Sequence, residues 1–209
     1  ELVFTCTPAT DAGGINRYNL NVTDTTPPIS PAVNRNMFIG SPVSYNLKVS
    51  DFGWGSWQDG TYDWNVTAYD NAGNFAVYGA SFKVIIDQTS PNNFVKTSPL
   101  PNTPAALNYY ATNIADITFK WNIASDNDQI RKYELFIAPE PGAYAASGVD
   151  CALVTSATRT IAAEGKYKWS VRAYDRALNY RWSKPDFYFV YDVTKPVPGV
   201  KEDPFCTIS

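Results

Sequence analysis

The chain has 209 residues, a net charge of −3 and no histidine. A mildly acidic chain without clusters of lysine and arginine does not suit nucleic acid, whose phosphates attract concentrated positive charge. No apolar run approaches the roughly 18 residues that a membrane-spanning helix needs. We therefore expect neither a nucleic-acid partner nor a membrane span.

The lack of histidine also argues against catalysis. A Ser-His-Asp or Cys-His pair is impossible, and imidazole cannot ligate a metal. Carboxylates in expected loops, Asp70, Asp126, Asp128 and Asp175, are oxygen ligands of the kind calcium accepts, but no D-x-D-x-D-G loop is present. We interpret them as turn-forming and surface residues, and we predict no enzyme activity, no cofactor and no metal site.

The first expected strands are residues 2–6 and 15–20, and both recur later in the chain. They match residues 117–121 and 130–135 at an offset of 115 residues. In the second strand Tyr18, Leu20 and Val22 alternate with polar residues. Alternation with period two is typical of an antiparallel sheet with one buried face.

The strongest repeat follows. DGTYDWNVTAYD at residues 59–70 and EGKYKWSVRAYD at residues 164–175 are identical at seven of twelve positions, now at an offset of 105 residues. The first copy therefore contains ten extra residues in mid-domain. After each copy's strand we expect a short hairpin turn, as in Asp70–Asn74, where Asn and Gly accept positive φ. No helical period is evident, so the fold class is all-β.

Together these residues resemble a known family. The order ITFKW, IRKYELFI and EGKYKWSVRAYD is similar to fibronectin type III and immunoglobulin-like domains of secreted prokaryotic proteins. The resemblance implies that Trp121 is the core tryptophan of strand B, and that Tyr62 and Tyr167 are the strand-F tyrosines. It implies tandem β-sandwiches but no activity, because such modules host many functions.

The repeat predicts three segments whose boundaries do not coincide with whole domains at the two ends of the chain. We expect a β-sandwich over residues 1–91 that lacks strand A, a second β-sandwich over residues 92–197, and a tail over residues 198–209. Val95-Lys96 recurs as Val200-Lys201, and Pro99-Leu100 recurs as Pro204-Phe205. The tail therefore resembles the strand A of a following domain.

A missing edge strand leaves backbone groups unpaired and invites a strand from another chain. We expect the tail of one subunit to insert into the first domain of the next, with Val200 and Phe205 filling the core. Such heterologous contacts need not close, so they predict an extracellular filament of identical subunits. An intermolecular disulfide between Cys6 and Cys206 would staple each joint in an oxidising compartment, with Cys151 left over. The competing interpretation is three buried free thiols.

Other surface features keep further alternatives open. Asn21 and Asn65 begin N-x-Thr sequons on strands expected to be neighbours, so two glycans are expected side by side on a secreted protein. Trp54 and Trp57 are candidates for stacking on sugar, or else lids on the core. The alternative to a filament subunit is a two-domain fragment of a larger cell-surface adhesin, S-layer or carbohydrate-binding protein. In either case we expect a secreted or cell-surface location, with self, glycans or the cell surface as partners.

Overall fold

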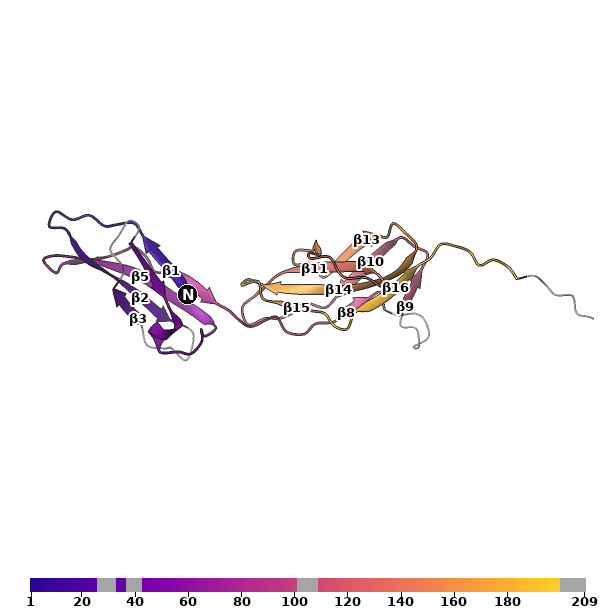
Figure 1. Ribbon diagram of the computed structural model, residues 1–209, viewed down its shortest axis with the longest axis horizontal. Helices are drawn as coiled ribbons and strands as arrows, with labels where there is room; N and C mark the ends of the chain where they lie inside the picture. Colours follow the sequence, from indigo (N-terminus) through magenta and orange to yellow (C-terminus); the bar gives the residue numbers. More distant parts are fainter. Residues whose placement is uncertain (26–32, 37–42, 101–108, 200–209) are drawn as a thin grey trace, which may run out of the picture. The chain divides into compact units, whose positions relative to one another are not determined.

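A computed structural model describes residues 1–25, 33–36, 43–100 and 109–199. The chain divides into two compact units, Glu1–Thr89 and Ser90–Ser209. The expected boundary after residue 91 lies two residues later. Most of the expected tail, residues 200–209, falls outside the described residues, which contain β-strands and one short 3-10 helix but no α-helix (Figure 1).

The first unit holds two sheets. One pairs β1 with β4, and the other has the order β3-β2-β5-β6, with β7 also paired to β5. The elements are β1 Leu2–Cys6, β2 Ile15–Asp24, β3 Val33–Asn36, β4 Val43–Leu47, η1 Val49–Phe52, β5 Gly60–Asp70, β6 Phe75–Val77 and β7 Phe82–Ile86.

The second unit repeats this plan with additional strands. One sheet has the order β13-β10-β8, and the other has the order β12-β11-β14-β16-β9, with β15 paired to β14. The elements are β8 Lys96–Ser98, β9 Tyr109–Thr112, β10 Asp116–Trp121, β11 Ile130–Pro139, β12 Val149–Asp150, β13 Ser156–Thr160, β14 Gly165–Asp175, β15 Tyr180–Trp182 and β16 Phe187–Tyr191.

The sequence repeat is also a repeat of strand register. Ile15 lies opposite Asp70 in the β2–β5 ladder, and Ile130 lies opposite Asp175 in the β11–β14 ladder. Both ladders contain an irregularity one residue after the isoleucine. The two copies therefore fold alike, and the expected all-β fold class is confirmed.

Each unit has its own core, built from the inward faces of its two sheets. The first comprises Phe4, Tyr18, Leu20, Val22, Val43, Leu47, Tyr62, Val66 and Ala68. The second includes Phe94, Phe119, Trp121, Tyr133, Leu135, Trp169, Val171 and Phe189. Trp121 is buried on β10, as the resemblance implied.

The two strand-F tyrosines also take the expected role. The hydroxyl of Tyr62 donates to the carbonyl of Gln58 at 2.9 Å, and that of Tyr167 donates to the carbonyl of Ala163 at 2.8 Å. Each bond runs four residues upstream, as in the tyrosine corner of β-sandwiches. The tyrosines thus tie the loop before β5 and β14 to the strand.

The hairpin after each of these strands differs at one position. Gly73 has φ +91° in the first unit, and Leu178, its counterpart in the second, has φ +74°. A leucine in the left-handed region carries strain of about 1–2 kcal/mol. Glycine relieves this strain, but it loses more backbone entropy on folding, which offsets part of the gain. Replacing Leu178 with glycine should raise the free energy of unfolding by up to about 1 kcal/mol in denaturant titrations. Gly73→Leu should do the reverse, and a destabilised Leu178→Gly variant would contradict the expectation.

Candidate strand-accepting edge of the first domain

Strand β1 is paired on one side only within the described residues. It runs antiparallel to β4, from Leu2 opposite Leu47 to Cys6 opposite Val43. Its counterpart in the second unit, β10, lies between β13 and β8. The described part of the first unit therefore has no counterpart of β8, the first strand of the second sandwich.

Within the described residues, strand β7 also has a partner on one side only. It pairs with β5, whereas its counterpart β16 pairs with β14 and, in parallel, with β9. Phe82 and Ile85 on β7 are 63% and 43% exposed, and Val3 on β1 is 65% exposed. In the second unit, one stretch of chain supplies the strands at both edges, β8 and β9. The described residues of the first unit offer no equivalent stretch.

The second unit shows how such an edge is filled. Lys96, the first residue of β8, lies opposite Trp121 of β10 and is only 5% exposed. Its ammonium group donates to the backbone carbonyls of Ser183 and Pro185. It also lies 5.5 Å from the ring centroid of Trp169 and 4.7 Å from that of Phe187. A lysine, rather than an apolar side chain, is therefore the buried residue of this strand.

The environment of Lys96 keeps its charge largely intact at neutral pH. Burial lowers the pKa of Lys96 to about 8, with Asp186 opposing and Lys184 adding to the shift. Carbonyl acceptors and aromatic faces both favour the ammonium form, which limits the cost of burying it.

The residues expected to fill the core of a neighbouring subunit, Val200 and Phe205, lie outside the described residues. Their counterparts in the second unit are Val95 and Leu100, which are 55% and 54% exposed. Phe94, Lys96 and Pro99 are the buried residues among 94–100, and Lys96 corresponds to Lys201. No described residue tests Val200 and Phe205 as the side chains that fill the core, so that expectation stays a prediction. The Val-Lys pair shared by residues 95–96 and 200–201 is the sequence signal for Lys201, although lysine side chains are mostly exposed in proteins.

The cysteines do not form a bridge within the described residues. Cys6 and Cys151 are free thiols, and Cys206 lies outside the described part of the chain. Burial raises the pKa of the Cys6 thiol, with a hydrogen bond to Tyr78 opposing the shift. Cys151 is 6% exposed in the core of the second unit, and its pKa is also raised by burial. Cys151 therefore has the surroundings of an unreactive structural thiol, and the Cys6–Cys206 bridge stays a prediction.

The two sequon asparagines are direct neighbours. Asn21 on β2 lies opposite Asn65 on β5, and its amide nitrogen donates to the side-chain oxygen of Asn65 at 3.0 Å and to Thr67 at 3.2 Å. Both side chains are half-buried, rather than fully turned to solvent as the alternation suggested. Thr67 itself is buried on that face. Glycosylation of either residue stays a prediction.

The tryptophans proposed for sugar stacking pack on the core. Trp54 stacks on Phe52 with ring centroids 4.4 Å apart and meets Tyr62 edge-on at 6.2 Å. Trp57 meets the same Phe52 ring at 5.9 Å. Both indoles are half-buried against the first core and lie in the stretch that contains the extra residues. Their packing matches the expected core lids, while sugar binding stays a prediction.

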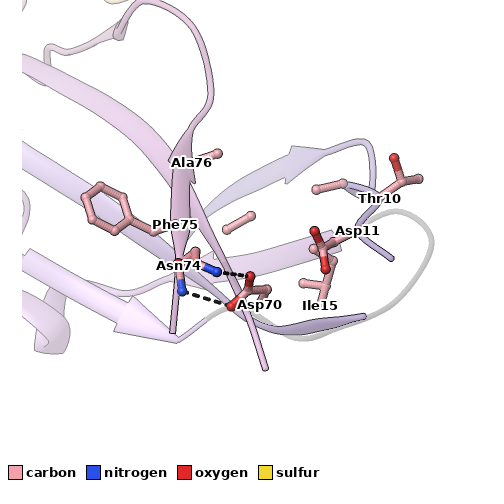
Figure 2. A pocket seen from close by; sticks show the side chains of 9 residues that line it. Thr10, Asp11, Ile15, Asp70, Asn74, Phe75 and Ala76 are labelled. Atoms are coloured by element: carbon pink, nitrogen blue, oxygen red, sulfur yellow. Dashed lines mark hydrogen bonds between the residues drawn. The ribbon is translucent and has the colours of Figure 1, made fainter. Parts of the chain in front are cut away.

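The loop acids serve the turns. Figure 2 shows a pocket of the first unit in which Asp70 accepts bonds from the backbone and side-chain nitrogens of Asn74, at 2.8 and 2.7 Å. Asp11, on the same pocket, accepts from the amide of Gly13 at 2.7 Å. In the second unit Asp175 accepts from the amide of Asn179 at 2.8 Å. These are the local bonds that make aspartate a turn-forming residue.

The fold is similar to those of several solved proteins. Fibronectin(III)-like modules of CbhA from Clostridium thermocellum are 13% identical, with a TM-score of 0.48, covering 95% of this chain and 100% of theirs. The FN1-FN3 domains of chicken CNTN1 are 14% identical, with a TM-score of 0.46, covering 84% and 57%. A β-1,2-glucanase from Parabacteroides distasonis is 17% identical, with a TM-score of 0.32, covering 92% and 27%. No family model and no curated protein matches the sequence.

Within the described residues, no helix is both long enough and apolar enough to cross a membrane.

Proposed function

We propose that the chain is a structural, non-catalytic module of a secreted or cell-surface protein, and that its first domain is completed by a β-strand donated to β1. The observation that carries the proposal is the difference between β1, paired only with β4, and β10, paired with both β13 and β8. The role needs no reacting group, which suits a chain without histidine.

The open edge has a physical reason to accept a strand. Backbone N–H and C=O groups on the free side of β1 require partners, and an extended segment supplies them in register. Exposed Phe82 and Ile85 add apolar surface on β7, which within the described residues also has a partner on one side only. Strand addition would cover both strands, as β8 and β9 do in the second unit.

We further propose that the donor is residues 198–209 of another copy, which gives a head-to-tail extracellular filament. Val200-Lys201 and Pro204-Phe205 repeat the Val95-Lys96 and Pro99-Leu100 pairs of the segment that includes β8. The contact joins two different surfaces, so it extends rather than closes.

A second candidate is favoured by the origin of β8 itself. Residues 96–98 precede β10 in the same chain and belong to the same compact unit. By analogy, residues preceding Leu2 in a longer polypeptide would complete the first domain. The chain would then be a two-domain part of a larger adhesin, S-layer or carbohydrate-binding protein.

Deletion of residues 199–209 separates these candidates. The full chain should form concentration-dependent oligomers in light scattering and fibres in electron microscopy, and the truncated chain should be monomeric. In the truncated chain, hydrogen exchange should be fast for the β1 amides that point away from β4. A synthetic peptide of residues 196–209 should slow it, because the amides gain partners.

Two results would count against self-assembly. Equal oligomers with and without the tail would remove the tail as the donor. Monomers in both cases, with β1 amides that the peptide does not protect, would favour a strand from a longer polypeptide. A non-reducing gel tests the Cys6–Cys206 bridge separately: a covalent ladder that collapses with reducing agent would support the bridge, and monomers under both conditions would exclude it.

A further inference from the structure

We infer that the open edge of the first domain selects its donor strand by one lysine, Lys201 of a second copy, whose ammonium group lies over the rings of Trp64 and Phe82. The inference rests on the proposed strand donation and names the residue that is recognised. In the second unit, β8 occupies the position that a donated strand would take in the first unit. We therefore call β8 the ligand and the remaining strands of the second unit the receptor.

The receptor side of that complex is defined around Lys96. Its ammonium group meets the faces of Trp169 and Phe187, whose centroids are 5.9 Å apart, and two backbone carbonyls. Trp169 is fully buried and packs edge-on against Phe119 of β10, with centroids 4.9 Å apart. The Trp169–Phe119 contact therefore joins the two sheets beneath β8, and Phe187 lies beside Trp169 in the same sheet.

The first unit holds the same aromatic arrangement without a described lysine on it. Trp64 and Phe82, at the positions equivalent to Trp169 and Phe187, have centroids 5.4 Å apart. Trp64 meets Phe4 of β1 edge-on at 4.9 Å, as Trp169 meets Phe119. Phe82 is 63% exposed and Trp64 is half-buried. An exposed aromatic pair beside an unpaired strand offers a cation the electron-rich faces that Lys96 uses.

The backbone of the receptor is also shared. The amide of Ser183 donates to the carbonyl of Val171 at 2.8 Å, and at the equivalent place the amide of Tyr78 donates to the carbonyl of Val66 at 2.8 Å. The carbonyl of Tyr78 therefore lies directly after β6, as the carbonyl that Ser183 presents to Lys96 lies directly after β15.

One residue covers the edge in the absence of a strand. Tyr78 replaces the small Ser183, and its hydroxyl donates to the carbonyl of Thr7 at 2.6 Å, directly after β1. Burial raises the pKa of Tyr78 to about 12, so the hydroxyl remains a donor at physiological pH. In the second unit the amide of Asn122, the counterpart of Thr7, donates to the carbonyl of Val95 in the residue before β8. An incoming strand paired as β8 is would bond to the amide of Thr7, the residue whose carbonyl Tyr78 already contacts.

The register of β8 identifies the residue that meets Cys6. Lys96 lies opposite Trp121, so the repeat offsets place Lys201 opposite Cys6. Cys206 is five residues further along, a distance of about 16 Å in an extended strand, whereas a disulfide needs Cα atoms about 4.4–6.8 Å apart. A donated strand with the register of β8 therefore cannot form a Cys6–Cys206 bridge. The lysine anchor requires the register of β8.

Peptide binding tests the inference. The receptor is the chain without residues 199–209, and the ligand is the synthetic peptide of residues 196–209, measured by calorimetry and by hydrogen exchange of β1. Lys201→Met should weaken binding about tenfold, since a desolvated cation over two rings is lost. Lys201→Arg should retain most of the affinity. Val200→Ala should change it little, because the equivalent Val95 is exposed.

Receptor variants provide the matched controls. Phe82→Leu keeps the exposed position apolar, and it should reduce the difference in affinity between the natural peptide and its Lys201→Met variant. Tyr78→Ser reproduces the residue found in the second unit and should tighten binding of the natural peptide. Circular dichroism and the exchange pattern of the second unit report whether each variant is folded.

The outcomes are distinguishable from those of the proposed function. If Lys201→Met binds as tightly as the natural peptide while Val200→Ala or Phe205→Ala abolishes binding, strand donation stands and the lysine anchor is wrong. If the natural peptide does not bind at concentrations up to about 1 mM, both the tail donor and the lysine anchor are overturned.

Discussion

Replacing Trp169 with alanine should lower the free energy of unfolding of the second domain by about 3–5 kcal/mol. Trp169 is fully buried between the two sheets. Its ring centroid lies 4.9 Å from that of Phe119 and 5.9 Å from that of Phe187. Removing the indole leaves a cavity that these rings cannot fill, and it also takes one aromatic face from Lys96. Hydrogen exchange resolved by peptide, in increasing denaturant, reports the stability of each domain separately.

The matched change in the first domain is Trp64→Ala, which should cost roughly half as much. Trp64 is half-buried because no described strand covers it and Phe82. When the peptide of residues 196–209 is bound, the cost should approach that of Trp169→Ala, since the indole is then enclosed. Equal costs in both domains without peptide would show that the first core is already complete.

Replacing Glu134 with alanine should destabilise the second domain by about 3 kcal/mol. The Glu134 carboxylate is buried and binds Arg172 at 2.8 Å, Lys132 at 2.7 Å and the hydroxyl of Tyr174 at 3.0 Å. Without it the Arg172 guanidinium, whose side chain is 14% exposed, loses its counter-ion inside a group of aromatic rings. The control is Lys83→Met, which breaks an exposed pair with Asp63 and should cost less than about 1 kcal/mol.

The same carboxylate predicts a pH dependence. Burial alone would raise the pKa of Glu134, but hydrogen bonds from Arg172, Lys132 and Tyr174 lower it from 4.5 to about 2. A folded-state pKa below the unfolded value stabilises the domain above pH 4.5, and that contribution is lost as the pH falls towards 2. Denaturant titrations between these values should show a smaller loss for Glu134→Gln than for the natural chain. A loss of the same size in both would assign the acid sensitivity to other carboxylates.

Several features of the fold follow from local pattern. The alternation around Tyr18, Leu20 and Val22 predicted the buried face of β2, because side chains on a strand point to opposite sides in turn. The repeat predicted equivalent strands in the two copies, and the β2–β5 and β11–β14 ladders have the same register because their inward residues match. The turn at Asp70–Asn74 was predicted from residue chemistry alone, and its hydrogen bonds are local.

The candidate site was only partly predictable. The sequence repeat indicated a first sandwich that lacks strand A, which stays a prediction. Within the described residues β1 pairs with β4 alone. The identity of the buried anchor was not predictable, because apolar Val95 and Leu100 are exposed while charged Lys96 is buried. Hydrophobicity alone would place Val95 and Leu100 inside and Lys96 outside. Lys96 is buried because the register of β8 places it opposite Trp121.

The sequence by itself determined the all-β class, the two copies and the correspondence between residues 95–100 and 200–205. Each of these depends on periodicity or identity along the chain. The tertiary structure alone decided which aromatic rings and carbonyls surround the buried lysine of β8. Trp169, Phe187 and Ser183 are far from Lys96 in sequence, and only sheet packing brings their faces and carbonyls to one ammonium group.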